Sequence, residues 1–114
     1  MDLKITTNVV GGVTILECHG RLVLGEEASL LRETMKGLLP QTKKIVIKMK
    51  DISYIDSGGL GTLVGIYTSA RNQGVEVKLA ELTSRVDTLL QVTKLLTVFE
   101  VHTSVDAAVK SFAA

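Results

Sequence analysis

The sequence predicts that residues 1–114 form a single two-layer α/β domain, and three observations support this. The first is size, because 114 residues of which 46% are hydrophobic suffice for one core without disulfides or metal. The second is the order of strand and helix patterns along the chain, ββαβαβαβα. The third is that charged residues such as Lys48, Lys50 and Lys78 alternate with apolar ones in the strands. We therefore expect a mixed five-strand sheet with one face partly wet and helices packed mainly on the other.

The first two predicted strands cover residues 3–9 and 13–19, where apolar and polar residues alternate. Gly11 and Gly12 lie between them. A Gly-Gly pair between two strand patterns indicates a two-residue hairpin. These strands should therefore be antiparallel neighbours.

A loop over residues 20–25 is expected to follow, and Glu26 and Glu27 then open a helix. Acidic residues favour a helix start because they complement the helix dipole. Pro40 ends the helix, since proline cannot continue the hydrogen-bond pattern. The apolar stripe at helical spacing, which should be buried, is made of Ala28, Leu31, Met35 and Leu38.

The second half of the chain repeats the alternation of helix and strand. Its elements are recognised by cap residues and by apolar periodicity. In chain order they are a helix that stops near Gly74, a strand over 75–80, a helix capped by Thr83 or Ser84, a strand over 98–101, and a helix capped by Ser104.

The most informative stretch is Asp56-Ser57-Gly58-Gly59-Leu60-Gly61. It follows an alternating strand at residues 44–50 and leads into an amphipathic run, so it should lie at a strand-to-helix turn. Ser57 is interpreted as the N-cap, whose hydroxyl accepts a hydrogen bond from a backbone N–H in the first helical turn. Gly58 and Gly59 carry no side chains, which should leave that hydroxyl uncovered and let another molecule approach closely.

This stretch resembles the Asp-Ser-x-Gly-Leu-Gly signature of bacterial anti-sigma factor antagonists, which belong to the STAS domain family. The likeness runs through nearly the whole chain in length and order of elements. In that family the serine after the aspartate is phosphorylated by a partner kinase that is also an anti-sigma factor. The resemblance implies that Ser57 is the phosphoacceptor. The residues implied for the partner-binding switch loop are Asp56, Gly58, Gly59, Leu60, Gly61, Val23 and Leu24.

The same resemblance implies a mechanism. The unphosphorylated chain would sequester the anti-sigma factor kinase and so free a sigma factor, and phosphorylation of Ser57 would release the kinase. ATP and magnesium would belong to that partner, and a phosphatase is a further candidate partner. The chain departs from the family at Val23, where many antagonists carry an acidic residue, which leaves open the kind of kinase. Val23 and Leu24, if exposed, would instead offer the partner an apolar contact.

Each of these residues also has a purely structural interpretation. Ser57 could be only an N-cap, a role compatible with phosphorylation. Asp56 is interpreted first as a turn residue that hydrogen-bonds the backbone after it, and otherwise as a group that orients Ser57 or meets a basic or metal-bearing group on the partner. Gly58, Gly59 and Gly61 could serve close packing of the helix on the sheet. A nucleotide cradle is disfavoured, because the glycine fingerprint is incomplete and no Gly-Lys-Ser/Thr follows.

The alternatives come from two other classes. A serine hydrolase would use Ser57 as nucleophile with His19 or His102 as base, but Ser57 is not in a Gly-x-Ser-x-Gly elbow. A STAS module could also serve another client, such as a signalling scaffold or a transport ATPase, without phosphorylation of Ser57. Cys18 is expected in the core, and no residues have metal-ligand spacing. We therefore predict a non-enzymatic protein with no catalytic residue, metal or cofactor.

Composition restricts the partners and the compartment. The net charge is +1 and aromatic residues make up 4%, so the basic clusters and stacking rings of nucleic-acid binders are missing. No apolar run approaches the ~18 residues of a membrane helix, and the N-terminus lacks the apolar core of a signal peptide. A single cysteine fits a reducing compartment. We expect a cytoplasmic protein that binds neither nucleic acid nor membrane.

Overall fold

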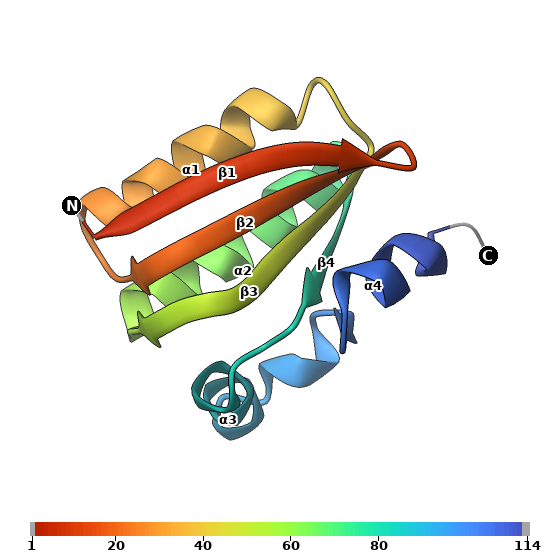
Figure 1. Cartoon of the computed structure of the whole chain (residues 1–114). Helices are drawn as coiled ribbons and strands as arrows, with labels where there is room; N and C mark the ends of the chain where they lie inside the picture. Colours follow the sequence, from red (N-terminus) through yellow and green to blue (C-terminus); the bar gives the residue numbers. More distant parts are fainter. Residues whose placement is uncertain (1, 113–114) are drawn as a thin grey trace.

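A computed structural model describes residues 2–112 and contains one five-stranded mixed sheet. The strand order in space is β1-β2-β3-β4-β5, and the elements follow the predicted order ββαβαβαβα with one short 3-10 helix added, as Figure 1 shows. The first pair is antiparallel and the other neighbours are parallel. The strands are β1 Leu3–Val10, β2 Val13–Leu22, β3 Lys44–Ile55, β4 Glu76–Ala80 and β5 Val101–His102.

The hairpin between β1 and β2 has the predicted two-residue turn. Gly11 and Gly12 have φ angles of 57° and 79°, both in the left-handed region that a type I′ turn requires. Val10 and Val13 therefore face each other as the first pair of the antiparallel ladder. The hairpin prediction is confirmed.

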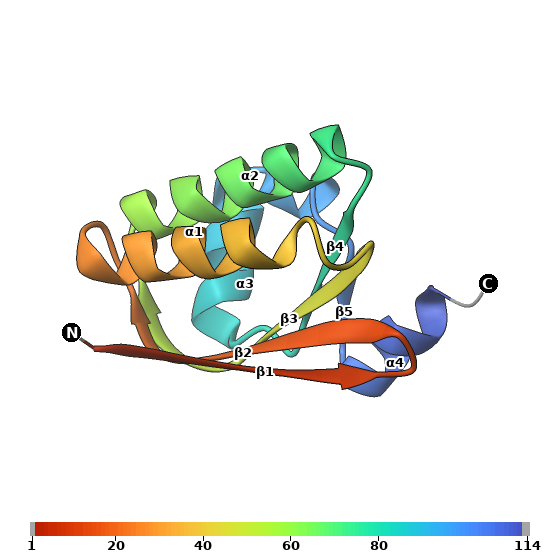
Figure 2. The same cartoon turned by 90° about the horizontal axis from the view of Figure 1, so that it is seen from above.

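Three helices cover one face of the sheet, namely α1 Glu26–Leu38, α2 Ser57–Asn72 and α3 Ser84–Val92. Each connects two parallel strands that are neighbours in the sheet. Crossovers of this kind are right-handed, so successive steps in one direction place all the helices on the same side. Figure 2 shows α1 and α2 above the strands. The main core lies between these layers and includes Leu16, Ile47, Leu31, Leu63 and Leu90.

The last helix, α4 Val105–Ser111, lies on the opposite face, which the sequence predicts to be partly wet (Figure 2). Ala108 of α4 is buried in a second, smaller apolar cluster with Ile15 and Val46. Ile15 and Leu16 are adjacent, and successive side chains of a strand point to opposite faces. This explains why the two residues contribute to different clusters. Helices therefore pack mainly, but not only, on one face.

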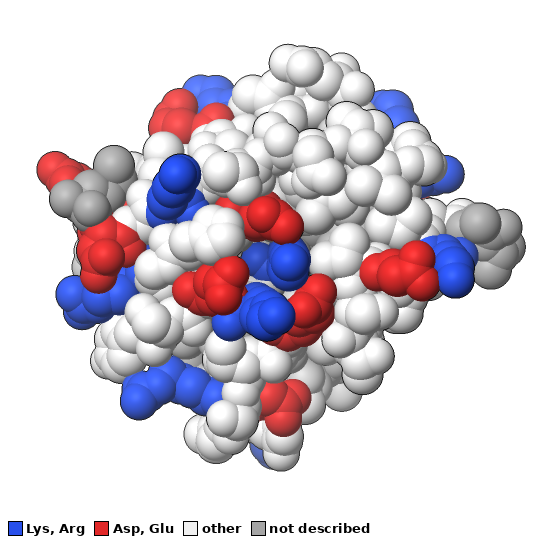
Figure 3. Space-filling model, in the orientation of Figure 1, with Lys and Arg blue, Asp and Glu red and all other residues white. Residues whose placement is uncertain are grey.

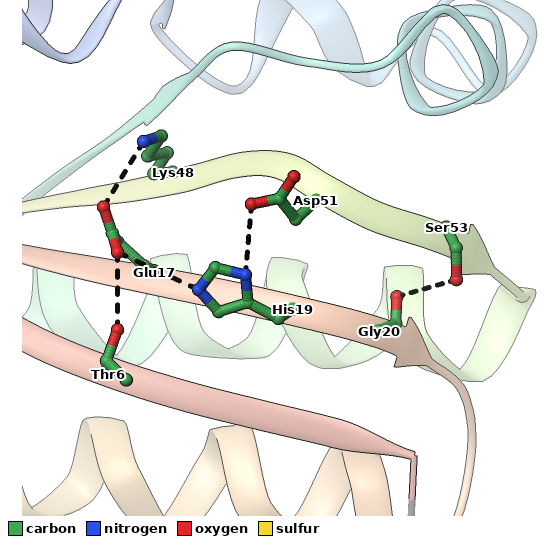
Figure 4. Close-up of polar contacts among 7 residues, drawn as sticks. All are labelled: Thr6, Glu17, His19, Gly20, Lys48, Asp51 and Ser53. Carbon is green, nitrogen blue, oxygen red and sulfur yellow. Dashed lines mark hydrogen bonds and ion pairs between the residues drawn. The ribbon is translucent and has the colours of Figure 1, made fainter.

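The part of this second face that α4 leaves open is polar, as predicted. His19 Nδ1 lies 3.1 Å from Asp51 Oδ2, and Lys48 Nζ lies 3.3 Å from Glu17 Oε1 (Figure 4). Figure 3 shows acidic and basic side chains interspersed across the middle of the same face. These pairs are solvent-exposed or half-buried and satisfy one another, so they account for the alternation of charged and apolar residues in the strands.

Lys78 departs from this pattern, because it is buried with an exposed fraction of 5%. Its Nζ lies 2.6 Å from Ser111 Oγ and 2.9 Å from Glu100 Oε2. The ring of Phe112 lies 4.0 Å from the same nitrogen. The prediction that Lys78 faces water is wrong, because α4 folds back over this part of β4.

Three element boundaries also differ from the prediction. β3 runs from Lys44 to Ile55 instead of ending at residue 50, because residues 51–55 pair with the end of β2. β2 continues to Leu22 instead of ending in a loop at residue 20, because it pairs with β3 as far as Leu22 opposite Ile55. The last strand is Val101–His102 rather than residues 98–101, and the 3-10 helix Leu95–Thr97 precedes it.

Several local predictions are confirmed. Thr83 and Ser104 accept hydrogen bonds as the N-caps of α3 and α4, and Gly74 has a φ angle of 74° just after α2. Cys18 is buried in the core, and burial raises the pKa of its thiol to about 12, so it stays protonated. None of the helices within residues 2–112 has the length and apolar character needed to cross a bilayer.

Candidate functional site

The start of α2 is capped by Asp56, not by Ser57. Asp56 has an extended backbone, and its Oδ1 accepts a hydrogen bond of 2.7 Å from the N–H of Gly59. Gly59 is the third helical residue, the position from which an N-cap side chain normally receives this bond. Ser57 is therefore the first residue of the helix, and the prediction that it is the N-cap is wrong. The interpretation of Asp56 as a residue that bonds the backbone after it is confirmed.

This arrangement leaves the Ser57 side chain free. Ser57 is exposed, and within residues 2–112 its hydroxyl takes part in no hydrogen bond. The backbone N–H groups of a helix's first turn have no intrahelical partner, and the helix dipole is positive there. A phosphate on Ser57 would therefore lie at a favourable end of α2. The hydroxyl is available for chemistry without loss of the helix cap.

Asp56 also joins the start of α2 to the loop between β2 and α1. The N–H of Leu24 donates to both carboxylate oxygens of Asp56 at 3.2 Å, and the N–H of Asp56 donates to the carbonyl of Leu22 at 3.3 Å. Leu24 and Asp56 are 32 positions apart in the chain. The structure thus brings Leu24 and the start of α2, two parts of the predicted switch loop, together.

The two apolar residues of the Val23-Leu24 segment have different environments. Val23 is half-buried, and its carbonyl accepts a hydrogen bond of 3.1 Å from Ala28 at the start of α1. Leu24 is exposed, with 74% of its surface accessible. The expected apolar contact surface is therefore Leu24 rather than the pair.

The glycines of the switch loop serve different purposes. A β-carbon on Gly58 would lie 2.6 Å from Leu24 Cβ, and one on Gly59 would lie 2.1 Å from the carbonyl oxygen of Leu22. These two glycines let the end of β2 and the β2–α1 loop pack directly on α2. They therefore face Leu22 and Leu24, and they do not leave the open approach for another molecule that the sequence predicts. Gly61 is exposed, and nothing lies within 4 Å of its β-carbon position. The interpretation as close packing of the helix on the sheet is confirmed for Gly59, which lies against Leu22 of β2. Gly58 packs on the β2–α1 loop instead, and the interpretation is wrong for Gly61.

Leu60 belongs to the core and not to the surface of the site. Its exposed fraction is 6%, and it packs in the main cluster. Its membership of the partner-binding switch loop stays a prediction. Its role here is to anchor the first turn of α2 against the sheet.

The carboxylate of Asp56 is held in its charged form. The hydrogen bond from Gly59 lowers its pKa most, desolvation opposes this effect, and the bond from Leu24 lowers the pKa further. Hydrogen bonds to a carboxylate favour the charged form, which explains the direction. The site therefore carries a fixed negative charge beside the Ser57 hydroxyl.

A groove of about 600 Å³ begins beside Gly58 and runs between α1 and α2. Its walls include Arg32 of α1 and Gly61 and Gly65 of α2. No pattern in the sequence indicates this groove, because its sides come from two helices whose spacing only the fold determines.

The residues proposed for a hydrolase do not meet. His19 is bound to Asp51, and His102 Nε2 lies 2.6 Å from Glu100 Oε2. In the described part of the chain neither histidine is hydrogen-bonded to Ser57. A general base must be within hydrogen-bond reach of the proton that it takes, so this arrangement gives the hydrolase alternative no support. Among residues 2–112 there is also no group of three potential metal ligands.

Comparison with known proteins fits this geometry. The family model of the STAS domain matches residues 4–108. The chain belongs to the STAS domain family. One relative, the anti-sigma-B factor antagonist of Bacillus subtilis (strain 168), is 34% identical over 83 residues, which is 73% of this chain and 76% of that protein. The alignment therefore covers the larger part of both proteins.

Solved structures show the same fold. An anti-sigma factor antagonist from Mycobacterium paratuberculosis superposes with a TM-score of 0.85 at 15% identity, covering 98% of this STAS domain and 95% of that chain. Unphosphorylated SpoIIAA gives a TM-score of 0.78 at 16% identity, covering 97% and 98%, and the phosphorylated form of SpoIIAA is also similar. A sulfate transporter family protein from Wolinella succinogenes gives 0.73 at 21% identity, covering 91% and 87%. The fold is thus shared by antagonists and by a transporter family protein.

Proposed function

We propose that this STAS domain is an anti-sigma factor antagonist that works as a phosphorylation switch. Unphosphorylated, it binds an anti-sigma factor kinase and frees a sigma factor. After phosphorylation of Ser57 by that kinase, it dissociates, and a phosphatase restores the binding form. ATP and magnesium belong to the kinase, so the domain itself needs no cofactor and catalyses no reaction. The proposed compartment is the cytoplasm, where these partners and ATP meet.

The observation that carries the proposal is the free hydroxyl of Ser57 at the first position of α2. It is exposed, it is not needed for capping, and it lies at a helix end that tolerates anions. Two comparisons add support, because the Bacillus relative is named an antagonist and a protein of the same fold, SpoIIAA, has been solved in both phosphorylation states.

The switch acts through charge and bulk at the partner surface. A phosphate adds about −1.5 to −2 charges at pH 7, next to the fixed charge of Asp56. Leu63 of α2, by contrast, is buried in the core and need not move. A partner that covers Leu24, Ser57 and Gly61 would lose its contact with this surface and meet unfavourable charge instead.

A pull-down from the source organism with wild type and Ser57→Asp in parallel would identify the partner. Its affinity for the unmodified and the Ser57-phosphorylated domain would then be measured by calorimetry. We expect at least tenfold weaker binding after phosphorylation, which is ~1.4 kcal/mol. Ser57→Ala should bind like wild type but should not be released by ATP. Equal affinity of both forms would refute the switch.

The second candidate is a STAS module with another client, such as a signalling scaffold or a transport protein. The structural likeness to a sulfate transporter family protein favours it. In that case the captured partner would not be a kinase, and phosphopeptide mapping of the protein from its native cell would find Ser57 unmodified.

A further inference from the structure

Asp56 has two hydrogen-bonding tasks that can be separated. Its bond to the N–H of Gly59, 2.7 Å long, caps α2. Its two contacts with the N–H of Leu24, both 3.2 Å long, hold the β2–α1 loop. We refer to the contacts with Leu24 as the clamp. Capping is a local feature of one helix, whereas the clamp joins two segments that are distant in sequence.

The clamp fixes the position of the exposed apolar residue of the site. Leu24 rests on Gly58, where any side chain at residue 58 would collide with it, and most of its surface faces solvent. A leucine whose backbone is already fixed loses less conformational freedom on binding, which favours its use as an apolar contact. The contact with Asp56 is therefore what presents Leu24 to a partner.

We propose that Asp56 is a positioning residue whose clamp on Leu24 opens when Ser57 is phosphorylated, so that the switch also withdraws an apolar contact. This inference rests on the proposed function, because it assumes that Ser57 receives a phosphate. It adds a conformational component to the change of charge.

The physical reason is repulsion between like charges at the start of α2. The phosphate would lie one residue from the carboxylate and carry the same sign of charge. Asp56 is half-buried, so water screens this repulsion only in part. The carboxylate can reduce the repulsion by shifting away from the phosphate. The contacts with Leu24 are the longer ones, so they are lost before the capping bond to Gly59.

The test needs only the isolated domain. Phosphoserine is incorporated genetically at position 57, and amide hydrogen exchange is measured residue by residue. The Leu24 amide should exchange at least tenfold faster in the phosphorylated protein, while Ile47 in the centre of β3 keeps its rate. An unchanged rate at Leu24 would overturn the proposal, and faster exchange throughout the sheet would do so as well.

A matched substitution separates the clamp from the cap. Asparagine caps a helix as well as aspartate does, but Asp56→Asn removes the charge and one of the two oxygens that receive the Leu24 N–H. The Leu24 amide should again exchange at least tenfold faster, with Gly59 still protected. Unchanged exchange at Leu24 in Asp56→Asn would contradict the clamp. If Asp56 only capped α2, phosphorylation of Ser57 would leave the exchange rate of the Leu24 amide unchanged.

Should Asp56→Asn fail to fold, the phosphoserine protein still decides the question, because it contains no substitution. Failure of this proposal and failure of the proposed function would also give different results. Absence of Ser57 phosphorylation in the cell would remove the switch but not the measured coupling, and an unresponsive Leu24 would remove the coupling while leaving a switch that works by charge alone.

Discussion

A side chain on Gly58 would collide with Leu24, because a β-carbon on this glycine would lie 2.6 Å from Leu24 Cβ. Gly61, one turn later in α2, has open space at the same position. The two glycines of one motif are therefore held by different constraints. Only the first is required by the packing of the β2–α1 loop.

Gly58→Ala should consequently destabilise the domain, whereas Gly61→Ala should stabilise it. Overpacking typically costs about 1–3 kcal/mol, and alanine at an unstrained helical glycine gains about 0.4–1 kcal/mol by restricting the unfolded chain. Urea unfolding of both variants measures the difference. A loss of stability in Gly61→Ala would contradict the open environment of that residue.

Ser57→Ala should change the free energy of unfolding by no more than about 0.5 kcal/mol, as is usual for exposed positions outside special features. Asp56→Ala should be clearly more destabilising, because it removes the cap and the contact with Leu24 together. Urea denaturation of the two variants measures their free energies of unfolding. If Ser57→Ala were the costlier change, the assignment of the cap to Asp56 would be wrong.

The stabilising effect of Asp56 should depend on pH in the acid range. Hydrogen bonding, above all from Gly59, lowers the pKa of this carboxyl in the folded protein below its ordinary value of 3.8. A lowered folded-state pKa means that the stabilisation is complete above about pH 3.8 and is lost as the pH falls through the folded-state pKa. Stability curves of wild type and Asp56→Asn should therefore converge on acidification. Curves that stay parallel between neutral pH and pH 3 would argue against this contribution.

Lys78 should anchor α4, since its ammonium group contacts Ser111, Glu100 and the ring of Phe112. Lys78→Ala should lower the free energy of unfolding by about 1–3 kcal/mol, because it leaves hydrogen-bonding groups without their buried partner. Amide exchange at Ala108 should accelerate more than exchange in β3. Lys110→Ala is a suitable control, because the ion pair that Lys110 forms with Asp106 in the same helix is exposed. Equal effects of the two substitutions would show that the buried contacts do not hold the helix.

Much of the fold could be predicted because it depends on short-range patterns. The Gly11-Gly12 hairpin, the caps at Thr83 and Ser104, and the left-handed Gly74 each follow from the backbone preferences of one or two residues. Alternation within strands separated the polar from the apolar face over most of the sheet. The Asp56–Gly61 stretch identified the family, which the match over residues 4–108 then established.

Long-range pairing decided the rest. The extension of β2 to Leu22 depends on β3, and the burial of Lys78 depends on a helix that returns from the end of the chain. The contact between Leu24 and Asp56 joins residues from two loops. A single sequence carries no local signal for such contacts, because their partners are distant in the chain. The contact of Leu24 with Asp56 forms only when β2 and β3 align in parallel, and the contacts of Lys78 form only when α4 folds back over β4. The sequence by itself therefore determined the fold class and the exposed serine, whereas the tertiary structure decided which residue caps α2 and which leucine lies against Asp56 and Gly58.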